Sequence, residues 1–405
     1  MRPARPSGSA RATIVLGRVL PRALLALFAT DRALKLAAVT QFMRREWPAV
    51  RTPWPSVTLV QPITRAPHDF TPILTVRRLL DYPGTVQHLP VCDRADLASQ
   101  ARCRALLGDD VAILLVDPDG GTIATMVAKV RAALPHISGE IVCFVDDDVT
   151  LPPDALQTLI APLMQQGVGA TFGVARYIAW GTIPSSLMSM FVNANALLSY
   201  LPLTYLTKPF TVTGHCFALR HATLTAIGGF GDDPDRIDDD HELARRVRAH
   251  GLRIVQTRLI YDVTNSLDSF SAYRVQMRRW FIFPRQAMLP YLHSRERALL
   301  SLGSIGGILP ALLLVLVLLT RRCSALGAYL VALLLAACVQ LRLERAYLGS
   351  VTPPRRWLLF PFVVTITPAH ILALLAARPI VEWRGQRLYV HDGGTFTVLG
   401  PARSK

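Results

Sequence analysis

The chain has 405 residues, of which 51% are hydrophobic, and 44 basic against 28 acidic residues give it a formal net charge of +16. This hydrophobic content excludes an ordinary water-soluble protein and indicates a membrane protein, while the length allows one α/β domain of roughly 240 residues beside membrane elements. The positive charge predicts attraction to anionic lipid headgroups. We expect no nucleic-acid partner, because no basic run with interleaved aromatic residues indicates one.

Residues 1–54 predict a tail followed by a segment that anchors the chain at the membrane. Residues 12–30 are apolar but are interrupted by Arg18, Pro21 and Arg22. Such a segment fits a poor membrane span, a helix lying in the membrane interface, or a signal peptide. The signal peptide is the least favoured of the three.

Residues 55–295 predict an α/β domain. Apolar strand-like runs at 56–63, 85–91, 112–116 and 140–145 alternate with segments of helical pattern. Strands that alternate with helices predict a Rossmann-like, mainly parallel sheet covered on both faces. Ligands of such sheets bind at the carboxyl ends of strands, and Asp93 and the cluster 146–148 lie there.

The cluster Asp146-Asp147-Asp148 predicts a metal site. In an extended chain Asp146 and Asp148 point to one side and Asp147 to the other. Two carboxylates on one side repel each other unless a cation joins them, and Mg²⁺ or Mn²⁺, which phosphates and water can complete, is the natural partner. The alternative is a solvated turn that caps the next helix, a role for which Asp154 is better placed.

Residues 183–205 are apolar and uncharged but contain Asn193 and Asn195. A membrane span would tolerate these amides poorly. We expect an amphipathic helix that lies in the interface and lines a lipid entrance, with a buried helix of the domain as an equal alternative.

Two polar patterns follow in the second half of the domain. Three aspartates, 238–240, open an amphipathic helix, although one would suffice as a cap. Gln276, Arg279 and Trp280 share a helix face by their spacing. A buried arginine needs an anion and an indole can stack on a sugar, whereas the alternative is an interfacial pair before a membrane span.

Residues 296–380 predict membrane helices, and residues 381–405 a tail. The uncharged stretches 299–319 and 324–341 are long enough to cross the hydrocarbon core, and a third stretch, 357–376, is expected to be kinked by Pro361 and Pro368. Three full spans would put the tail on the side opposite to the domain. If the tail lies beside the domain, one segment must be re-entrant.

As a set, these motifs resemble those of the inverting glycosyltransferases of families 2 and 21, most closely the ceramide glucosyltransferase branch. The resemblance covers roughly residues 55–395, includes a tail with Trp383-Arg384-Gly385, and implies a GT-A fold. The chain departs from the family after Leu115, where an Asn-x-Lys element is missing. Gly120 and Gly121 could still offer backbone donors to a phosphate there.

For the donor side, the resemblance implies that Asp93 contacts the uracil, with Asp96 as the competing choice. Asp146 is expected on the nucleotide side, Asp148 on the Mg²⁺ or Mn²⁺ ion, and Arg279 at the diphosphate of UDP.

For the acceptor side, the resemblance implies that Asp240 is the catalytic base. Asp239 supports it and takes its place if the register is shifted by one. His215 and Gln276 are expected near the acceptor, and Trp280 is expected to stack on a sugar ring.

The resemblance therefore implies a multi-pass membrane enzyme whose catalytic domain faces the cytoplasm and moves a hexose from a UDP-sugar to a lipid hydroxyl, inverting the linkage. Ceramide is the first-choice acceptor, and a hopanoid lipid follows closely. A processive polysaccharide synthase would need a larger bundle of spans, and a non-catalytic membrane scaffold is suggested by the missing Asn-x-Lys. The choice of sugar, of Mg²⁺ or Mn²⁺, and of oligomeric state is left open.

Overall fold

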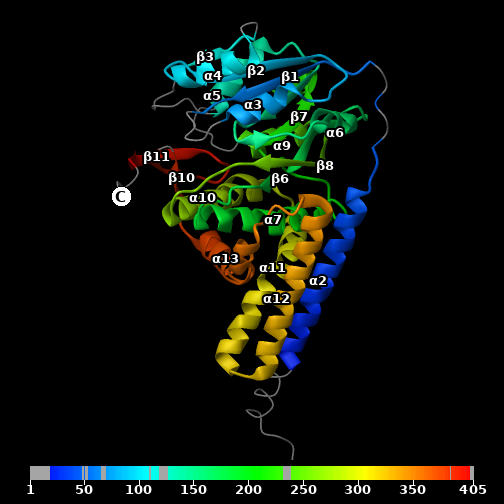
Figure 1. Ribbon diagram of the computed structural model, residues 1–405, viewed down its shortest axis with the longest axis vertical. Helices are drawn as coiled ribbons and strands as arrows, with labels where there is room; N and C mark the ends of the chain where they lie inside the picture. The colour runs from blue at the N-terminus through cyan, green and yellow to red at the C-terminus, as the bar shows by residue number, and fades with distance from the viewer. Residues whose placement is uncertain are drawn as a thin grey trace, which may run out of the picture.

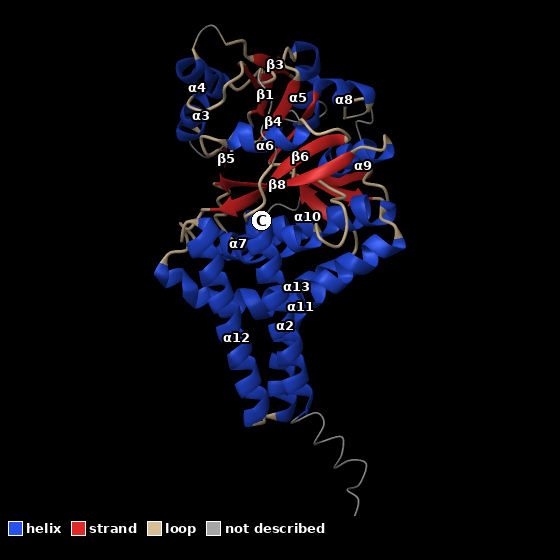
Figure 2. Cartoon of the chain, turned by 90° about the vertical axis from the view of Figure 1, so that its right-hand side faces the viewer, coloured by secondary structure: helices blue, strands red, loops and turns tan. Residues whose placement is uncertain are grey.

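The computed structural model describes residues 19–47, 50, 53–64, 70–108, 111–117, 126–230, 239–383 and 385–401, apart from the side chain of Asp239. An α/β domain stands on a bundle of long helices (Figures 1 and 2).

An eight-stranded mixed sheet forms the centre of this domain, in the order β3-β2-β1-β4-β7-β6-β8-β5. β3, β2, β1 and β4 are parallel, as are β6 and β8, whereas β7 runs antiparallel to both of its neighbours and β5 antiparallel to β8. The mainly parallel sheet expected from the sequence is confirmed. The strands are β1 (Val57–Pro62), β2 (Val86–Asp93), β3 (Leu114–Val116), β4 (Ile141–Val145), β5 (Val149–Thr150), β6 (Val168–Tyr177), β7 (Cys216–Arg220) and β8 (Arg253–Val263).

The apolar strand β4 is buried on both faces of the sheet. Cys143 and Val145 belong to the core on one face, and Val142 and Phe144 to the core on the other. A strand covered on both faces reads as a continuous apolar run in the sequence. The helices of the domain are α3 (Thr71–Arg78), α4 (Leu97–Leu107), α5 (Met126–Ala133), α6 (Ala155–Leu163), α7 (Ile183–Leu203), α8 (His221–Ala226), α9 (Asp239–Ala249) and α10 (Phe270–Phe283).

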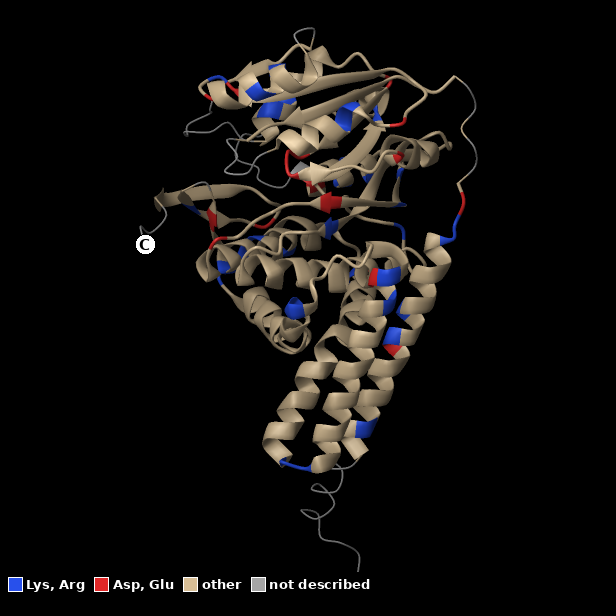
Figure 3. Ribbon diagram, viewed as in Figure 1, with Lys and Arg blue, Asp and Glu red and all other residues tan. Residues whose placement is uncertain are grey.

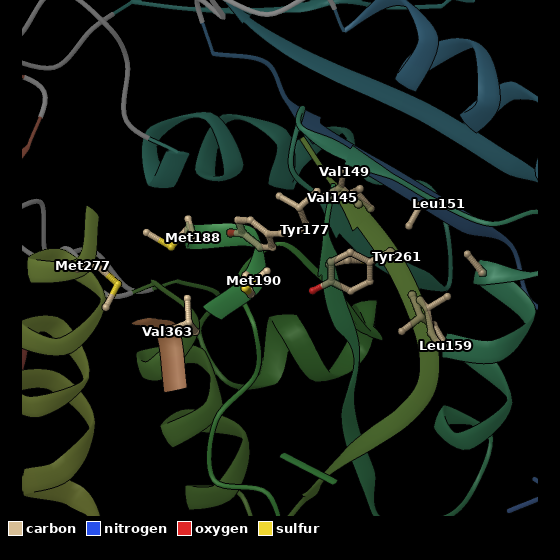
Figure 4. Packing of buried hydrophobic residues seen from close by; sticks show 14 of the residues in the cluster. Val145, Val149, Leu151, Leu159, Tyr177, Met188, Met190, Tyr261, Met277 and Val363 are labelled. Carbon is tan, nitrogen blue, oxygen red and sulfur yellow. The ribbon is translucent and has the colours of Figure 1, made fainter. Parts of the chain in front are cut away.

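The helix expected in the interface, α7, is buried between the sheet and the helix bundle. Asn193 replaces a strand partner for Tyr177 at the end of β6: its Oδ1 accepts from the Tyr177 N–H at 2.8 Å, and its Nδ2 donates to the Tyr177 carbonyl at 2.9 Å. Met188 and Met190 pack in the same core as residues of the sheet and of the bundle (Figure 4). The alternative of a buried domain helix therefore describes α7 better than a surface helix.

Three helices among the described residues are long and apolar enough to cross a membrane: Ser294–Thr320, Cys323–Leu348 and Pro354–Ala376. The first contains α11 (Ser294–Thr320), the second α12 (Cys323–Leu343), and both pack against α2 (Leu20–Met43), which extends in the same direction (Figure 1). The apolar segment expected to end near residue 30 thus continues as a helix to Met43.

The third apolar helix, α13 (Phe360–Ala376), begins and ends against the α/β domain. Before it, Arg356 Nη2 donates to the carbonyl of Trp180 at 2.9 Å, and after it the carbonyl of Ala377 accepts from Arg285 Nη1 at 2.8 Å. α13 therefore runs along the underside of the domain rather than away from it.

The tail forms a small antiparallel sheet beside α10. Its strands are β9 (Ile380–Trp383), β10 (Gln386–Val390) and β11 (Phe396–Pro401). Arg278 on α10 donates to the carbonyl of Arg378 at 2.8 Å, just before β9. The tail thus packs against the α/β domain.

We predict that Asn193→Ala lowers the free energy of unfolding by about 2–4 kcal/mol, because it leaves both backbone groups of Tyr177 buried without partners. Asn195→Ala is the control, since its amide bonds only the carbonyl of Phe191 in its own helix at 2.8 Å, and it should cost less than about 1 kcal/mol. Denaturant unfolding in detergent measures both. Equal losses would contradict this account of α7.

Candidate active site

A single cavity of about 1660 Å³ connects the carboxyl ends of the strands with the helix bundle. Its polar end contains Asp146, Asp148 and Asp240, and its walls also include side chains of α7, α10, α11, α13 and the tail. Residues from distant parts of the chain therefore face one continuous space.

The acidic turn between β4 and β5 contributes carboxylates to this cavity. Asp147 Oδ2 accepts from the N–H of Thr64 at 2.7 Å and from its hydroxyl at 2.6 Å, which ties the turn to the end of β1. The Oδ1 atom of Asp148 is buried and has no hydrogen-bond partner among the described residues. The backbone N–H of Asp146 donates to the carbonyl of His215 at 3.0 Å.

The donor set of this turn fits a divalent ion that has few protein ligands. No group of three or more His, Cys, Asp or Glu side chains among the described residues could hold a metal ion by itself. A buried carboxylate oxygen without a partner is costly, however, and Asp148 has one. Mg²⁺ or Mn²⁺ bound mainly through phosphates and water would satisfy it.

A buried arginine on α3 holds the acidic turn in place. Arg77 is 1% exposed, and its guanidinium donates to the side chain of Gln61 at 2.8 Å, to the carbonyl of Val149 at 2.8 Å and to the carbonyl of Asp146. Burial lowers the pKa of Arg77, and the charges of the acidic turn, Asp147 foremost, oppose that shift. The cation therefore also offsets the repulsion between the carboxylates of the turn.

Asp93, expected at the uracil, lies at the end of β2 in a fully buried ion pair. Its Oδ2 is 2.8 Å from Lys129 Nζ, which also donates to the carbonyl of Ile63 at 2.5 Å. Met126 and Arg131, on the same helix as Lys129, line the cavity. Gly120 and Gly121 lie outside the described residues.

Asp240, the expected base, opens α9 and lines the cavity. Its Oδ1 accepts from the N–H of His241 at 2.9 Å. Gly214 leaves space beside it, because a Cβ there would stand 3.4 Å from Asp240 Oδ2. The opposite end of α9 is fixed to α11 through Arg248 and Glu296, 2.5 Å apart. Asp238 and the side chain of Asp239 lie outside the part of the chain that the structure describes.

The three motif residues of α10, Gln276, Arg279 and Trp280, all line the cavity. The indole of Trp280 packs edge-on against the ring of Tyr177, with centroids 5.8 Å apart. The structure thus brings this helix face to the same space as Asp148 and Asp240.

His215 and Tyr177 form a hydrogen-bonded pair between the two carboxylate sites. The Tyr177 hydroxyl is 3.0 Å from His215 Nε2. Burial lowers the pKa of His215, against the charges of Asp148 and Asp240, and burial raises the pKa of Tyr177. Both side chains are therefore uncharged near neutral pH.

The tail closes one wall of the cavity through Trp383 of β9, with Gln386 and Leu388 of β10. Arg384, the second residue of the Trp-Arg-Gly pattern, lies outside the described residues.

Sequence reasoning missed Arg77, Lys129 and Tyr177. Lysine is rare in this arginine-rich chain, occurring only at positions 35, 129, 208 and 405, so Lys129 carried a weak signal. Arg77 sits on a short helix beside another arginine, and Tyr177 ends an apolar strand. Neither position differs in sequence from an ordinary surface or core residue.

Comparison with known protein families and curated proteins gives two matches. The family model described as glycosyl transferase family 21 matches residues 22–396. The O-antigen biosynthesis protein RfbC of Myxococcus xanthus is 30% identical over 150 residues, which cover 33% of this chain and 12% of that protein. The chain thus spans 12% of the length of this curated relative.

Among solved structures, the mannosyltransferase PcManGT of Pyrobaculum calidifontis, in complex with GDP-Man and Mn²⁺, superimposes with a TM-score of 0.51 at 18% identity. The likeness covers 87% of this chain and 97% of that one, and it shows a shared GT-A-like fold. A structure described as a mycobacterial protein has a TM-score of 0.37 at 17% identity, covering 60% and 80% of the two chains.

We predict that Arg77→Lys lowers the free energy of unfolding by about 2–5 kcal/mol, since a lysine cannot reach all three acceptors and leaves buried oxygens unpaired. The matched control is Arg78→Lys on the same helix, where an exposed guanidinium bonds only the carbonyl of Leu106 at 2.6 Å. That change should stay within about 0.5 kcal/mol. Thermal unfolding of the two purified variants compares them, and a stable Arg77→Lys protein would show that the turn does not depend on this guanidinium.

Proposed function

The chain belongs to glycosyl transferase family 21, and from that premise we propose that it moves a hexose from a UDP-sugar to the hydroxyl group of a membrane lipid. Ceramide is the first acceptor that we propose, and a hopanoid alcohol is the second. The linkage is inverted in a single displacement. The donor is a cytoplasmic metabolite, so the domain faces the cytoplasm in this proposal.

The proposal of a lipid acceptor rests on the continuity of the cavity. The same space that contains Asp148 and Asp240 extends to Ile308 of α11 and to Val363 and Ile371 of α13, on helices apolar enough for a membrane. A lipid with a hydroxyl at its head matches this combination, because its chains can lie on the apolar walls while the hydroxyl reaches the carboxylates.

The acidic turn would hold the donor. Asp148 would be the metal ligand, through the buried Oδ1 for which the described residues offer no partner, and Asp146 would lie toward the nucleotide. A bound Mg²⁺ or Mn²⁺ ion would stabilise the negative charge that develops on the diphosphate as it leaves. The Mn²⁺ and GDP-Man of the mannosyltransferase with the same fold support this use of the site. Asp93 is proposed to orient the uracil from its ion pair with Lys129.

Asp240 would act as the general base. As the lipid oxygen attacks the anomeric carbon, its proton passes to the carboxylate, the bond from sugar to phosphate breaks, and the electron pair leaves with UDP. Gly214 lies beside this carboxylate and, like it, lines the cavity. Asp239 is proposed to support the base from the preceding position.

The side chains of α10 would surround the transferred sugar. Arg279 would pair with the diphosphate, since it lines the same cavity as the acidic turn. Trp280, held edge-on by Tyr177, would offer its ring to the sugar. Gln276 and His215 would hydrogen-bond near the acceptor hydroxyl.

The direct test is UDP release by the purified protein in detergent. UDP-glucose, UDP-galactose, UDP-glucuronate and UDP-N-acetylglucosamine are each supplied with ceramide, a hopanoid alcohol or no acceptor, with Mg²⁺, Mn²⁺ or a chelator. We expect release that needs both metal and lipid. Release that ignores the lipid, or none with any pair, would reject a lipid glycosyltransferase.

We predict that Asp148→Ala removes the stimulation of turnover by Mg²⁺ and Mn²⁺ while the protein still folds, because one carboxylate fewer relieves like-charge repulsion in the turn. Asp154→Ala is the matched control: an exposed aspartate nearby, with no capping bond from its side chain to the backbone of α6. UDP release measured against metal concentration distinguishes the two. Normal metal dependence in Asp148→Ala would remove the metal assignment.

We predict that Asp240→Asn binds the UDP-sugar as the wild type does but transfers the sugar at least about a hundredfold more slowly, the usual size of a general-base contribution. The amide keeps the size of the side chain but cannot accept a proton at neutral pH.

The control for this prediction is Asp239→Asn, which should be milder. Donor binding by calorimetry and single-turnover transfer separate binding from chemistry. An inactive Asp239→Asn beside a nearly normal Asp240→Asn would move the base by one residue.

A further inference from the structure

Helix α2 has three charged residues, Asp31, Arg32 and Lys35, at the level where it packs against the apolar helix α11. Figure 3 shows blue and red segments in the upper part of the helix bundle, whereas the lower part is largely uncharged. Charged side chains at membrane depth are costly and rarely occur without a function. The proposed sugar transfer uses none of the three.

The three charges form a compact group in which Arg32 is buried and Asp31 and Lys35 are half-buried. Asp31 Oδ1 lies 3.0 Å from Lys35 Nζ, and Asp31 Oδ2 lies 2.7 Å from Arg32 Nη2. Lys35 Nζ also donates to the carbonyl of Gly303 at 2.6 Å. Arg32 is 8% exposed, with its guanidinium over the ring of Phe28 at 5.2 Å.

A glycine on α11 receives the carboxylate. A Cβ at Gly306 would stand 2.1 Å from Asp31 Oδ2, so any larger residue there would push this carboxylate aside. Asp31 is not among the residues that line the large cavity, whereas Arg32 and Lys35 are. The carboxylate of Asp31 therefore lies at the contact between α2 and α11, whereas Arg32 and Lys35 line the cavity.

The cavity wall therefore carries a surplus of positive charge. Two cations share one carboxylate, and Arg297, higher on α11, lines the same cavity. At 1.5 Å per residue, Gly303 and Gly306 lie only about 6 to 11 Å inside the uncharged stretch of α11, which begins at Leu299. An unbalanced cation at this depth favours an anion that can approach from the headgroup level.

We propose that Arg32 and Lys35 form a subsite for the phosphate group of an anionic phospholipid that occupies the membrane half of the cavity. The cavity that the two cations line also has apolar walls from the long helices, with Ile308 of α11 and Val339 of α12. Acyl chains cover such walls and a free phosphate ion does not, so the lipid is the occupant that matches both the charge and the surroundings. None of the residues assigned to the sugar-transfer chemistry belongs to this subsite.

The test counts lipids that stay bound to the intact protein in native mass spectrometry. Dioleoylphosphatidylglycerol and dioleoylglycerol share their acyl chains and differ in the phosphate. We expect the wild type to retain the former at least about tenfold better than the latter. Equal retention of the two lipids would overturn the proposal, and so would displacement of phosphatidylglycerol by millimolar inorganic phosphate, which would make free phosphate the ligand.

Two variants, one that removes a positive charge and one that removes the negative charge, distinguish a lipid-binding site from charges that only join α2 to α11. Arg32→Gln should weaken retention of phosphatidylglycerol roughly tenfold, whereas Asp31→Asn, which frees both cations, should strengthen it. Arg22→Gln on the same helix, an exposed cation outside the cavity lining, should change nothing. If Asp31→Asn and Arg32→Gln both weaken retention, the charges serve only to join α2 to α11, and the proposal fails.

Discussion

The buried guanidinium of Arg77 is the interaction on which the arrangement of the site depends. Three aspartates in a row repel one another, and a turn that contains them needs a cation or water to be stable. Arg77 supplies that cation from α3 and bonds two carbonyls of the turn, while Asp147 ties the turn to Thr64. All three aspartates line the cavity, and Asp147 does so while its carboxylate is bound to Thr64. A buried charge is costly, but here each neighbouring acceptor lowers that cost.

A shared hydrophobic core keeps the α/β domain and the helix bundle in one fixed relation. One cluster of buried side chains runs from β4 through α7 and α10 to α11, α12 and α13. α7 connects these parts because Asn193 hydrogen-bonds the end of β6. Its apolar side chains pack in the same core as the sheet and the helix bundle. A cavity with one wall from the domain and another from the membrane helices can exist only if these parts do not move independently.

Two departures from the sequence-based expectations have the same physical cause. The helix at the N-terminus passes through Asp31, Arg32 and Lys35 because these charges pair with one another and with a carbonyl of α11. α7 tolerates Asn193 in the interior because its amide satisfies two backbone groups of another element. In both cases a polar residue that reads as unfavourable in isolation is stabilised by a partner far away in the chain.

The sequence by itself determined the classes of structure and the chemistry of the motifs. The positions of β1 to β4, the mainly parallel sheet, two long apolar helices and the carboxylates at the strand ends all follow from local periodicity and composition, which act over a few residues. The tertiary structure alone decided that Arg77 supports the acidic turn and that Asp93 pairs with Lys129. It also decided that α13 returns the tail to the domain and that Asp31 turns away from the cavity while its two cations face it. These features depend on contacts between residues distant in the chain, and such contacts leave no periodic pattern in the sequence because they are set by the packing of whole elements.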